Sequence, residues 1–287
     1  IAGRERPAGI DYQPGVLLRV RRVPPLPEEL APTGSLFELE VSTAPLPRTK
    51  LPDPSRVADS ATRFYSRTLV VASGFEDSWP NIEVDPSAPR LYQRHQTLFR
   101  YAGNRKGWHV CIRCDGHLHV NETLAILATG DFAWGAARGA QDFTDKITIL
   151  TNGRPHGFTP ERLSVLKERN IPIITDRIVA HIGKGTDLMG LRLADGRELH
   201  FDGFLLDEGL TPNTEFFRRE DGWQFKTDEE GLLYVDEDGQ MLDPDGEPVP
   251  GLFAAGDIVA EQRNLIATAF ALGQNAGLAA SDLMREW

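Results

Sequence analysis

The sequence predicts an α/β protein, and three patterns along its 287 residues support that prediction. The first is an apolar run at 124–128 that ends in a Thr-Gly turn, followed by an amphipathic stretch at 132–143 and a second apolar run at 146–151. Strand, glycine turn, helix and strand in that order are typical of a βαβ unit. The second pattern is a pair of three-strand meanders, and the third is a closing strand and helix rich in small residues.

The N-terminal part is predicted to form one of the two meanders. Its strands are expected at 15–23, 35–43 and 63–71, with proline-rich loops at 24–32 and 44–54 between them. A second meander follows the βαβ unit, so the chain carries an internal repeat. Residues 1–14 cannot supply a βαβ unit for the first copy, and we therefore expect the chain to be truncated before Ile1.

The elements after the βαβ unit follow from periodicity and turn residues. A helix is predicted at 160–169 and a short strand at 171–175. The second meander is predicted at 177–181, 188–193 and 198–206, with Asp195-Gly196 as a hairpin turn. A buried strand at 251–257 and a helix at 265–284 close the chain, and the small side chains of that helix allow close approach to a ligand or a sheet.

The charge balance narrows the range of partners. The chain has 31 basic and 42 acidic residues, a net charge of −11, which argues against nucleic acid or an anionic membrane as the main partner. No apolar run approaches the ~20 residues of a membrane span, and no signal peptide is recognisable. A single cysteine pair suits a reducing compartment, so we expect a cytoplasmic protein.

The two cysteines of the chain are Cys111 and Cys114, and Asp115 and Gly116 follow at once. At this spacing one thiolate can attack a substrate disulfide and the other can resolve the mixed disulfide. Asp115 adds a carboxyl that can donate or accept a proton. One alternative is a pair of buried structural cysteines. Another is a metal site with His117 and His119, although structural zinc normally has a wider gap before its histidines. Redox chemistry without a metal is the favoured interpretation.

In this order, the motifs resemble those of the thioredoxin reductase family of flavoproteins. They are Cys111-Ile112-Arg113-Cys114-Asp115-Gly116, the βαβ unit, Thr211-Pro212-Asn213-Thr214, and Gly251-Leu252-Phe253-Ala254-Ala255-Gly256-Asp257. The resemblance implies two Rossmann-like ββα domains, the second inserted into the first, and a homodimer. Residues 1–103 and 213–287 would form a split FAD-binding domain that lacks its N-terminal βαβ unit. Residues 104–212 would form the inserted NADPH-type domain, which carries the cysteines.

The same resemblance implies a role for each site residue. Cys114 would lie against the flavin, Cys111 would attack the partner disulfide, and Asp115 would be the acid–base group. The FAD would be bound by Ser73 and Gly74 near its ring, by Gly256 and Asp257 near its ribityl and pyrophosphate groups, and by the start of the last helix at Leu265 and Ile266. Leu265 replaces the glutamine usual in the family.

The nucleotide fingerprint of the inserted domain departs from the family pattern. Ala128 stands where the first glycine makes the tight turn, and Phe132 stands at the helix start where phosphate should lie. The family's His-Arg-Arg is replaced by residues 151–153, Thr-Asn-Gly. Arg154 or Arg162 remain as alternative phosphate ligands. We expect that this domain does not bind NADPH. The acidic pair Asp207-Glu208 also departs from the family, and the sequence gives no physical reason for it.

The favoured function is an FAD-dependent thiol–disulfide oxidoreductase that does not use NADPH. Electrons would come from another donor, such as reduced ferredoxin or a second flavin, and would pass through Cys111 and Cys114 to a thioredoxin-like protein or a small disulfide. Three alternatives remain: a flavin dithiol oxidase that returns electrons to oxygen, a non-catalytic redox-sensing module, and an ordinary NADPH-dependent thioredoxin reductase.

Overall fold

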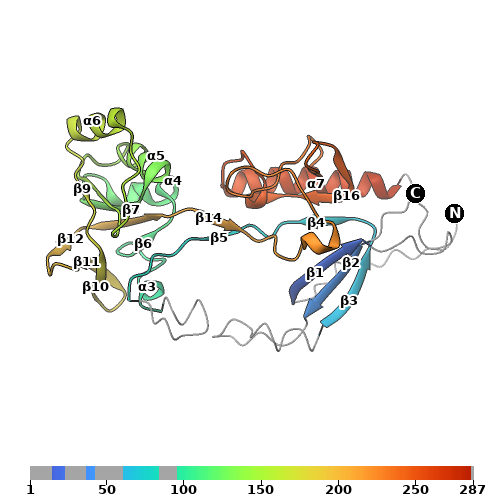
Figure 1. Ribbon diagram of the computed structural model, residues 1–287, viewed down its shortest axis with the longest axis horizontal. Helices are drawn as coiled ribbons and strands as arrows, with labels where there is room; N and C mark the ends of the chain where they lie inside the picture. Colours follow the sequence, from blue (N-terminus) through green and yellow to red (C-terminus); the bar gives the residue numbers. More distant parts are fainter. Residues whose placement is uncertain (1–14, 23–36, 43–60, 84–95, 286–287) are drawn as a thin grey trace. The chain divides into compact units, whose positions relative to one another are not determined.

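Figure 1 shows the computed structural model, which describes residues 15–22, 37–42, 61–83 and 96–285. The chain divides into two compact units. The first unit comprises Ile1–Phe75 and Pro212–Trp287, and the second comprises Glu76–Thr211, so the second is inserted into the first. The residues where the chain passes between units form β5 (Phe75–Asp77) and β14 (Leu210–Pro212), which pair with each other.

The second unit is built on a parallel five-stranded sheet whose order is β6-β13-β7-β8-β9. All five residues of β7 are buried, as expected for a strand covered on both faces. The bounds of the five strands, in sheet order, are Trp108–His109, Gly203–Asp207, Leu124–Ala128, Ile147–Leu150 and Ile173–Ile174.

Alternation along β7 divides its side chains between two cores. Leu124 and Ile126 pack with the helices α5 (Gly130–Ala140) and α6 (Pro160–Glu168) on one face. On the other face, Ala125 and Leu127 belong to the core that contains the antiparallel meander β10-β11-β12. The meander strands are Ile178–Lys184, Asp187–Leu193 and Glu198–His200. The βαβ unit, the helix at 160–169 and the second meander predicted from the sequence are thus present.

One predicted strand is wrong in extent, because residues 198–206 form two strands in two sheets. The chain turns at Asp202, whose carboxylate accepts hydrogen bonds from the Thr123 N–H at 2.9 Å and the Thr123 hydroxyl at 2.7 Å. That turn carries the chain from β12 in the meander to β13 in the parallel sheet. The predicted strand at 63–71 is divided in the same way, into β3 (Ala61–Ser66) and β4 (Leu69–Val71).

The first unit combines the antiparallel sheet β1-β2-β3 with the smaller sheet β15-β16-β4. Trp223 packs in its core and donates its indole N–H to the Val20 carbonyl at 2.7 Å. The helix α7 (Ile266–Arg285) buries Ala276 and Ala280 against β16. The other bounds are β1 Val16–Arg22, β2 Phe37–Ser42, β15 Gln240–Leu242, β16 Pro248–Ala254 and the 3-10 turn η3 Gly256–Ile258.

The compact units do not meet where the expected domain ranges meet. Residues 76–103 were expected with the FAD-binding range, yet Ile82, Leu98 and Tyr101 lie in the core of the second unit with Trp108. Apolar contact with the meander core places them there. The predicted loops at 24–32 and 44–54 lie outside the described residues. In the part of the chain that the structure describes, no helix combines the length and apolarity needed to cross a bilayer.

Gly203, the first residue of β13, leaves room for a buried histidine, and its replacement tests this packing. A Cβ atom at Gly203 would lie 2.7 Å from Nδ1 of His119. We expect Gly203→Ala to lower the free energy of unfolding by about 1–3 kcal/mol, the usual effect of overpacking. Gly135→Ala is the control, because a Cβ at Gly135 meets nothing within 4 Å. Helix propensity predicts that it stabilises the protein by about 0.5–1 kcal/mol. Urea denaturation followed by tryptophan fluorescence measures both, and equal effects would contradict the packing described here.

Candidate functional site

The cysteine pair lies on the loop and short helix that follow the edge strand β6. Cys111 is the N-cap of α4 (Ile112–Asp115), and its Sγ is bonded to Sγ of Cys114 at 2.05 Å. The Cys114 N–H also donates to Sγ of Cys111 at 3.2 Å. Cys111 is partly exposed and Cys114 is exposed, so a partner can reach the pair. The sequence-based expectation that these two thiols form a disulfide-exchanging pair is compatible with this placement.

Two glycines allow α4 to lie close to the rest of the second unit. Ile112 of α4 packs against Gly139 of α5, where a Cβ atom would come within 3.0 Å of its Cγ2 atom. Gly116 begins the 3-10 turn η1 (Gly116–His119), and a Cβ atom there would overlap the ring of Phe143. The glycine after Asp115 is therefore needed for packing, and the cysteine pair is held on a rigid support.

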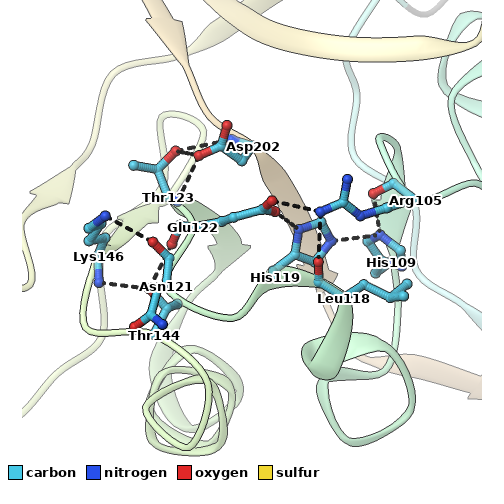
Figure 2. Close-up of polar contacts among 10 residues, drawn as sticks. All are labelled: Arg105, His109, Leu118, His119, Asn121, Glu122, Thr123, Thr144, Lys146 and Asp202. Atoms are coloured by element: carbon cyan, nitrogen blue, oxygen red, sulfur yellow. Dashed lines mark hydrogen bonds and ion pairs between the residues drawn. The ribbon is translucent and has the colours of Figure 1, made fainter.

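A row of hydrogen-bonded side chains runs inward from Asp115. Oδ2 of Asp115 lies 2.9 Å from Nδ1 of His109, and Nε2 of His109 lies 3.2 Å from Nε2 of His119. Nδ1 of His119 lies 3.0 Å from Oε2 of Glu122 (Figure 2). The His109 and His119 side chains are 8% and 3% exposed, whereas that of Asp115 is 39% exposed. The row thus joins a solvent-accessible carboxylate beside the cysteines to two buried imidazoles.

The far end of the row is fixed by Arg105 and by the turn before β7. Arg105 Nη2 donates to Oε1 of Glu122 at 2.6 Å and to the Leu118 carbonyl at 3.1 Å. The Glu122 carbonyl accepts from the Thr144 hydroxyl at 2.6 Å (Figure 2). Sequence reasoning had treated His119 only as an alternative metal ligand and had missed His109, Arg105 and Glu122. The signal that was available is the placement of His109 two residues before Cys111.

The start of α5, where a dinucleotide pyrophosphate would be expected, is occupied by the protein's own groups. Gly130 has a φ of 57°, and its N–H donates to the His156 carbonyl at 2.8 Å. Asp131 adds a carboxylate in the first turn and is ion-paired with Arg162. Arg162, considered above as a phosphate ligand, also lies over the Trp134 ring at 5.4 Å.

The second arginine considered as a phosphate ligand also has an acidic partner. Arg154 is ion-paired with Glu208, and both line a hollow of about 370 Å³ together with Arg177 and Asn152. Burial raises the pKa of Glu208 to about 7, against the opposing effect of Arg154, and Asp207 raises it further. The acidic pair that had no explanation in the sequence therefore includes the carboxylate that binds Arg154.

In the first unit, the residues expected at the flavin ring are held by the Thr-Pro-Asn motif. Ser73 Oγ donates to the Asn213 carbonyl at 2.7 Å, and Asn213 Nδ2 donates to the Ser73 carbonyl at 3.0 Å. The Asn213 N–H donates to the Gly74 carbonyl at 3.0 Å. These bonds fix the turn after β4, which is the carboxyl end of that strand.

Gly256 and Asp257 lie at the same edge of the sheet, because β16 runs parallel to β4 and the Ala255 N–H donates to the Val71 carbonyl at 2.9 Å. Gly256 has a φ of 76°, which favours glycine. Helix α7 contacts η3, and Ile266 at its start is 78% exposed. A hollow of about 740 Å³ is lined by Ile266, Ala269, Phe270, Ala271, Gly273 and Gln274.

The expected site residues thus form one group in each unit. Cys111, Cys114 and Asp115 belong to the second unit. The expected flavin-binding residues belong to the first, at the carboxyl ends of β4 and β16 and at the start of α7; they are Ser73, Gly74, Gly256, Asp257, Leu265 and Ile266. Ligands of α/β proteins commonly bind at this edge of a parallel sheet.

Comparison with known proteins places these features in a family context. The family described as Pyridine nucleotide-disulphide oxidoreductase matches residues 39–274. A flavoprotein-type relative, one component of the alkyl hydroperoxide reductase of Staphylococcus aureus (strain MRSA252), is 25% identical over 225 residues, which cover 76% of this chain and 39% of that protein. The corresponding Staphylococcus epidermidis protein is 25% identical over 227 residues, with the same coverage. The chain therefore spans less than half the length of these curated relatives.

Solved structures with the same fold include two thioredoxin reductases. That of Streptococcus pyogenes MGAS5005 has a TM-score of 0.69 at 16% identity, covering 95% of this chain and 74% of that chain. That of Giardia duodenalis has a TM-score of 0.66 at 16% identity, covering 94% of this chain and 74% of that chain. The expected fold class, two Rossmann-like ββα domains with the second inserted into the first, is confirmed.

Glu208 makes the stability of the second unit depend on pH. The unfolded chain releases the Glu208 proton near the ordinary pKa of 4.5, whereas the folded chain keeps it until about 7. Between these values the folded state binds more protons, so stability falls as the pH rises. The free energy of unfolding should therefore fall by roughly 2–3 kcal/mol between pH 5 and pH 8 because of this group.

Urea denaturation of wild type and Glu208→Gln at the two pH values measures this contribution. We expect the variant to have the flatter pH dependence. The control is Asp195→Asn, because the Arg197 N–H lowers the pKa of Asp195 and its contribution is lost only in more acidic solution. A Glu208→Gln variant with the full wild-type pH dependence would contradict the assignment.

Proposed function

Because this chain belongs to the pyridine nucleotide-disulphide oxidoreductase family, we propose that it is an FAD-dependent thiol–disulfide oxidoreductase whose Cys111–Cys114 pair reduces a partner disulfide. The observation that carries the proposal is the accessible disulfide between these residues, with the carboxylate of Asp115 directly after it in the chain. The partner is a thioredoxin-like protein or a small disulfide, and the protein acts in the cytoplasm as a homodimer.

The chain's own residues carry out the exchange in two steps. The Cys111 thiolate attacks one sulfur of the partner disulfide, the partner's S–S bond breaks, and the departing thiolate takes a proton from Asp115. The Asp115 carboxylate then accepts the proton of Cys114, and the Cys114 thiolate attacks the Cys111 sulfur. The Cys111–Cys114 bond re-forms and the second partner thiolate leaves. The cysteine pair is oxidised by two electrons and the partner disulfide is reduced by two.

The residues of the first unit fit the flavin end of FAD. The hollow beside α7 is lined largely by small and apolar groups, and the turn at Ser73-Gly74 is held open at the carboxyl end of β4. We assign Gly256, Asp257, Leu265 and Ile266 to the same cofactor. When bound, FAD supplies the two electrons that reduce the Cys111–Cys114 disulfide again.

We further propose that NADPH is not the source of these electrons. At the start of α5, the Gly130 N–H is already hydrogen-bonded and Asp131 would repel a pyrophosphate. Arg162 and Arg154 are each paired with a carboxylate, so neither is a free phosphate ligand. Reduced ferredoxin or a second flavoprotein is the donor class that this leaves.

Anaerobic titration with NADPH tests the choice of donor. The loss of three charge-assisted phosphate contacts, about 1.5–3 kcal/mol each, weakens the affinity for NADPH by several powers of ten. We therefore expect FAD-loaded protein to keep its flavin absorbance in roughly millimolar NADPH or NADH, and to lose it with dithionite, the positive control. Rapid bleaching at micromolar NADPH would refute this part of the proposal and leave the thiol–disulfide chemistry intact.

Single-cysteine variants test the roles of the two thiols. The backbone N–H that reaches Cys111 Sγ stabilises its thiolate. We expect Cys114→Ser, which keeps Cys111, to release nitrothiobenzoate from 5,5′-dithiobis(2-nitrobenzoate) about tenfold faster at pH 7 than Cys111→Ser, corresponding to about 1.4 kcal/mol.

Exposure alone predicts the opposite order, because Cys114 is the more exposed residue. Denaturation in urea provides the control, since both variants should then react at the same rate. A faster reaction of the Cys111→Ser variant in the folded state would contradict the assignment of Cys111 as the attacking thiol.

A further inference from the structure

Four contacts in the row behind Asp115 require hydrogens, and their positions can be derived from the groups involved. The Arg105 carbonyl lies 3.1 Å from Nε2 of His109 and can only accept, so His109 Nε2 carries a hydrogen. That hydrogen also points toward Nε2 of His119 at 3.2 Å, which is therefore the acceptor. The hydrogen of His119 then lies on Nδ1 and is donated to Glu122 (Figure 2). Every position inward of His109 Nδ1 is thereby assigned.

The remaining contact, between Nδ1 of His109 and Oδ2 of Asp115 at 2.9 Å, needs one more hydrogen. If that hydrogen lies on Asp115, both side chains are neutral. If it lies on His109, the imidazole is a cation and Asp115 is an anion. The hydrogen bonds to Arg105, His119 and Glu122 are the same in both forms, so the proton can move between Asp115 and His109 while the rest of the row keeps its arrangement.

We infer that His109 is the proton partner of Asp115: it holds the carboxyl in place and returns a proton to it each time Asp115 has protonated a departing thiolate. This inference rests on the proposed function and adds a positioning residue to its site. His109 does not touch the substrate and acts through Asp115. During the first exchange step the proton passes from Asp115 to the departing sulfur, and the His109 imidazolium gives its Nδ1 proton to the Asp115 carboxylate.

The surroundings of the row suit this role. His109 is held from both sides, because β6 is the edge strand beside β13 and Gly203 of β13 leaves space for the His119 ring. The charged groups that face the row are Arg105 from the loop before β6, Glu122 from the turn before β7, and Asp202 from the turn before β13. Arg105 and Glu122 pair with each other, and Asp202 accepts from Thr123.

The inference predicts that the effect of removing His109 depends on the leaving group. Oxidised glutathione releases a thiolate that needs a proton at pH 7, because ordinary thiols have a pKa of ~8.5. In contrast, 5,5′-dithiobis(2-nitrobenzoate) releases a stable anion that needs none. Protein reduced with dithiothreitol and then freed of it reacts with either disulfide without any flavin or nucleotide.

We expect His109→Asn, which can still donate to Asp115 but cannot carry the proton, to react about tenfold more slowly with oxidised glutathione at pH 7, within the usual range of general acid catalysis. Its rate with 5,5′-dithiobis(2-nitrobenzoate) should match wild type. At pH 9 the difference with glutathione should disappear. The matched control is His117→Asn on the same 3-10 turn, an exposed histidine that should leave both rates unchanged.

Each outcome of this experiment has a distinct meaning. Equal slowing of His109→Asn with both disulfides, or no slowing with either, would overturn the role of His109 while the proposed function stands. A wild-type protein that exchanges with neither disulfide would overturn the proposed function, and this inference with it. Nitrogen NMR of the wild-type imidazoles gives a test that needs no variant: we expect a hydrogen on Nε2 of His109 at pH 7, and a bare Nε2 would overturn the inference.

Discussion

The site in the second unit depends on how closely α4 and η1 can lie to the sheet and to α5. Gly139 receives Ile112, Gly116 receives the Phe143 ring, and Gly203 leaves space for His119. A side chain larger than hydrogen at any of these positions would move the segment that carries the cysteines. The chemistry of the sulfurs therefore begins with three positions that have no side chain, and the buried histidines are held by the same close packing.

Local patterns in the sequence predicted the parts of the fold that local interactions determine. The all-apolar strand β7, the helix α6 with its Thr159 cap, and the CxxC segment need no knowledge of distant residues. The division of residues 198–206 into two strands could not be predicted in this way, because it depends on Thr123, which is 79 positions away from Asp202 in the sequence. The assignment of residues 76–103 failed for a similar reason, since their apolar side chains find partners in a meander far along the chain.

The candidate site shows the same limit. Cys111, Cys114 and Asp115 form a motif that is visible in the sequence, whereas the row from His109 to Glu122 exists only once β6 and η1 lie side by side. Likewise, Arg154 and Glu208 are 54 positions apart, and the sequence could not show that the carboxylate binds an arginine that might have bound phosphate. A motif lost from a sequence indicates a lost ligand more strongly when the replacement residues also satisfy one another, as they do here.

The division into two units, each with its own buried cores, has a consequence for how the protein comes apart. Chains with independent cores melt in separate cooperative stages, and a single midpoint then describes neither of them. Trp223 lies in a core of the first unit and Trp108 in a core of the second, so each indole emits from a different stage of the transition. Replacing one of them by phenylalanine would separate the two melting curves within one molecule.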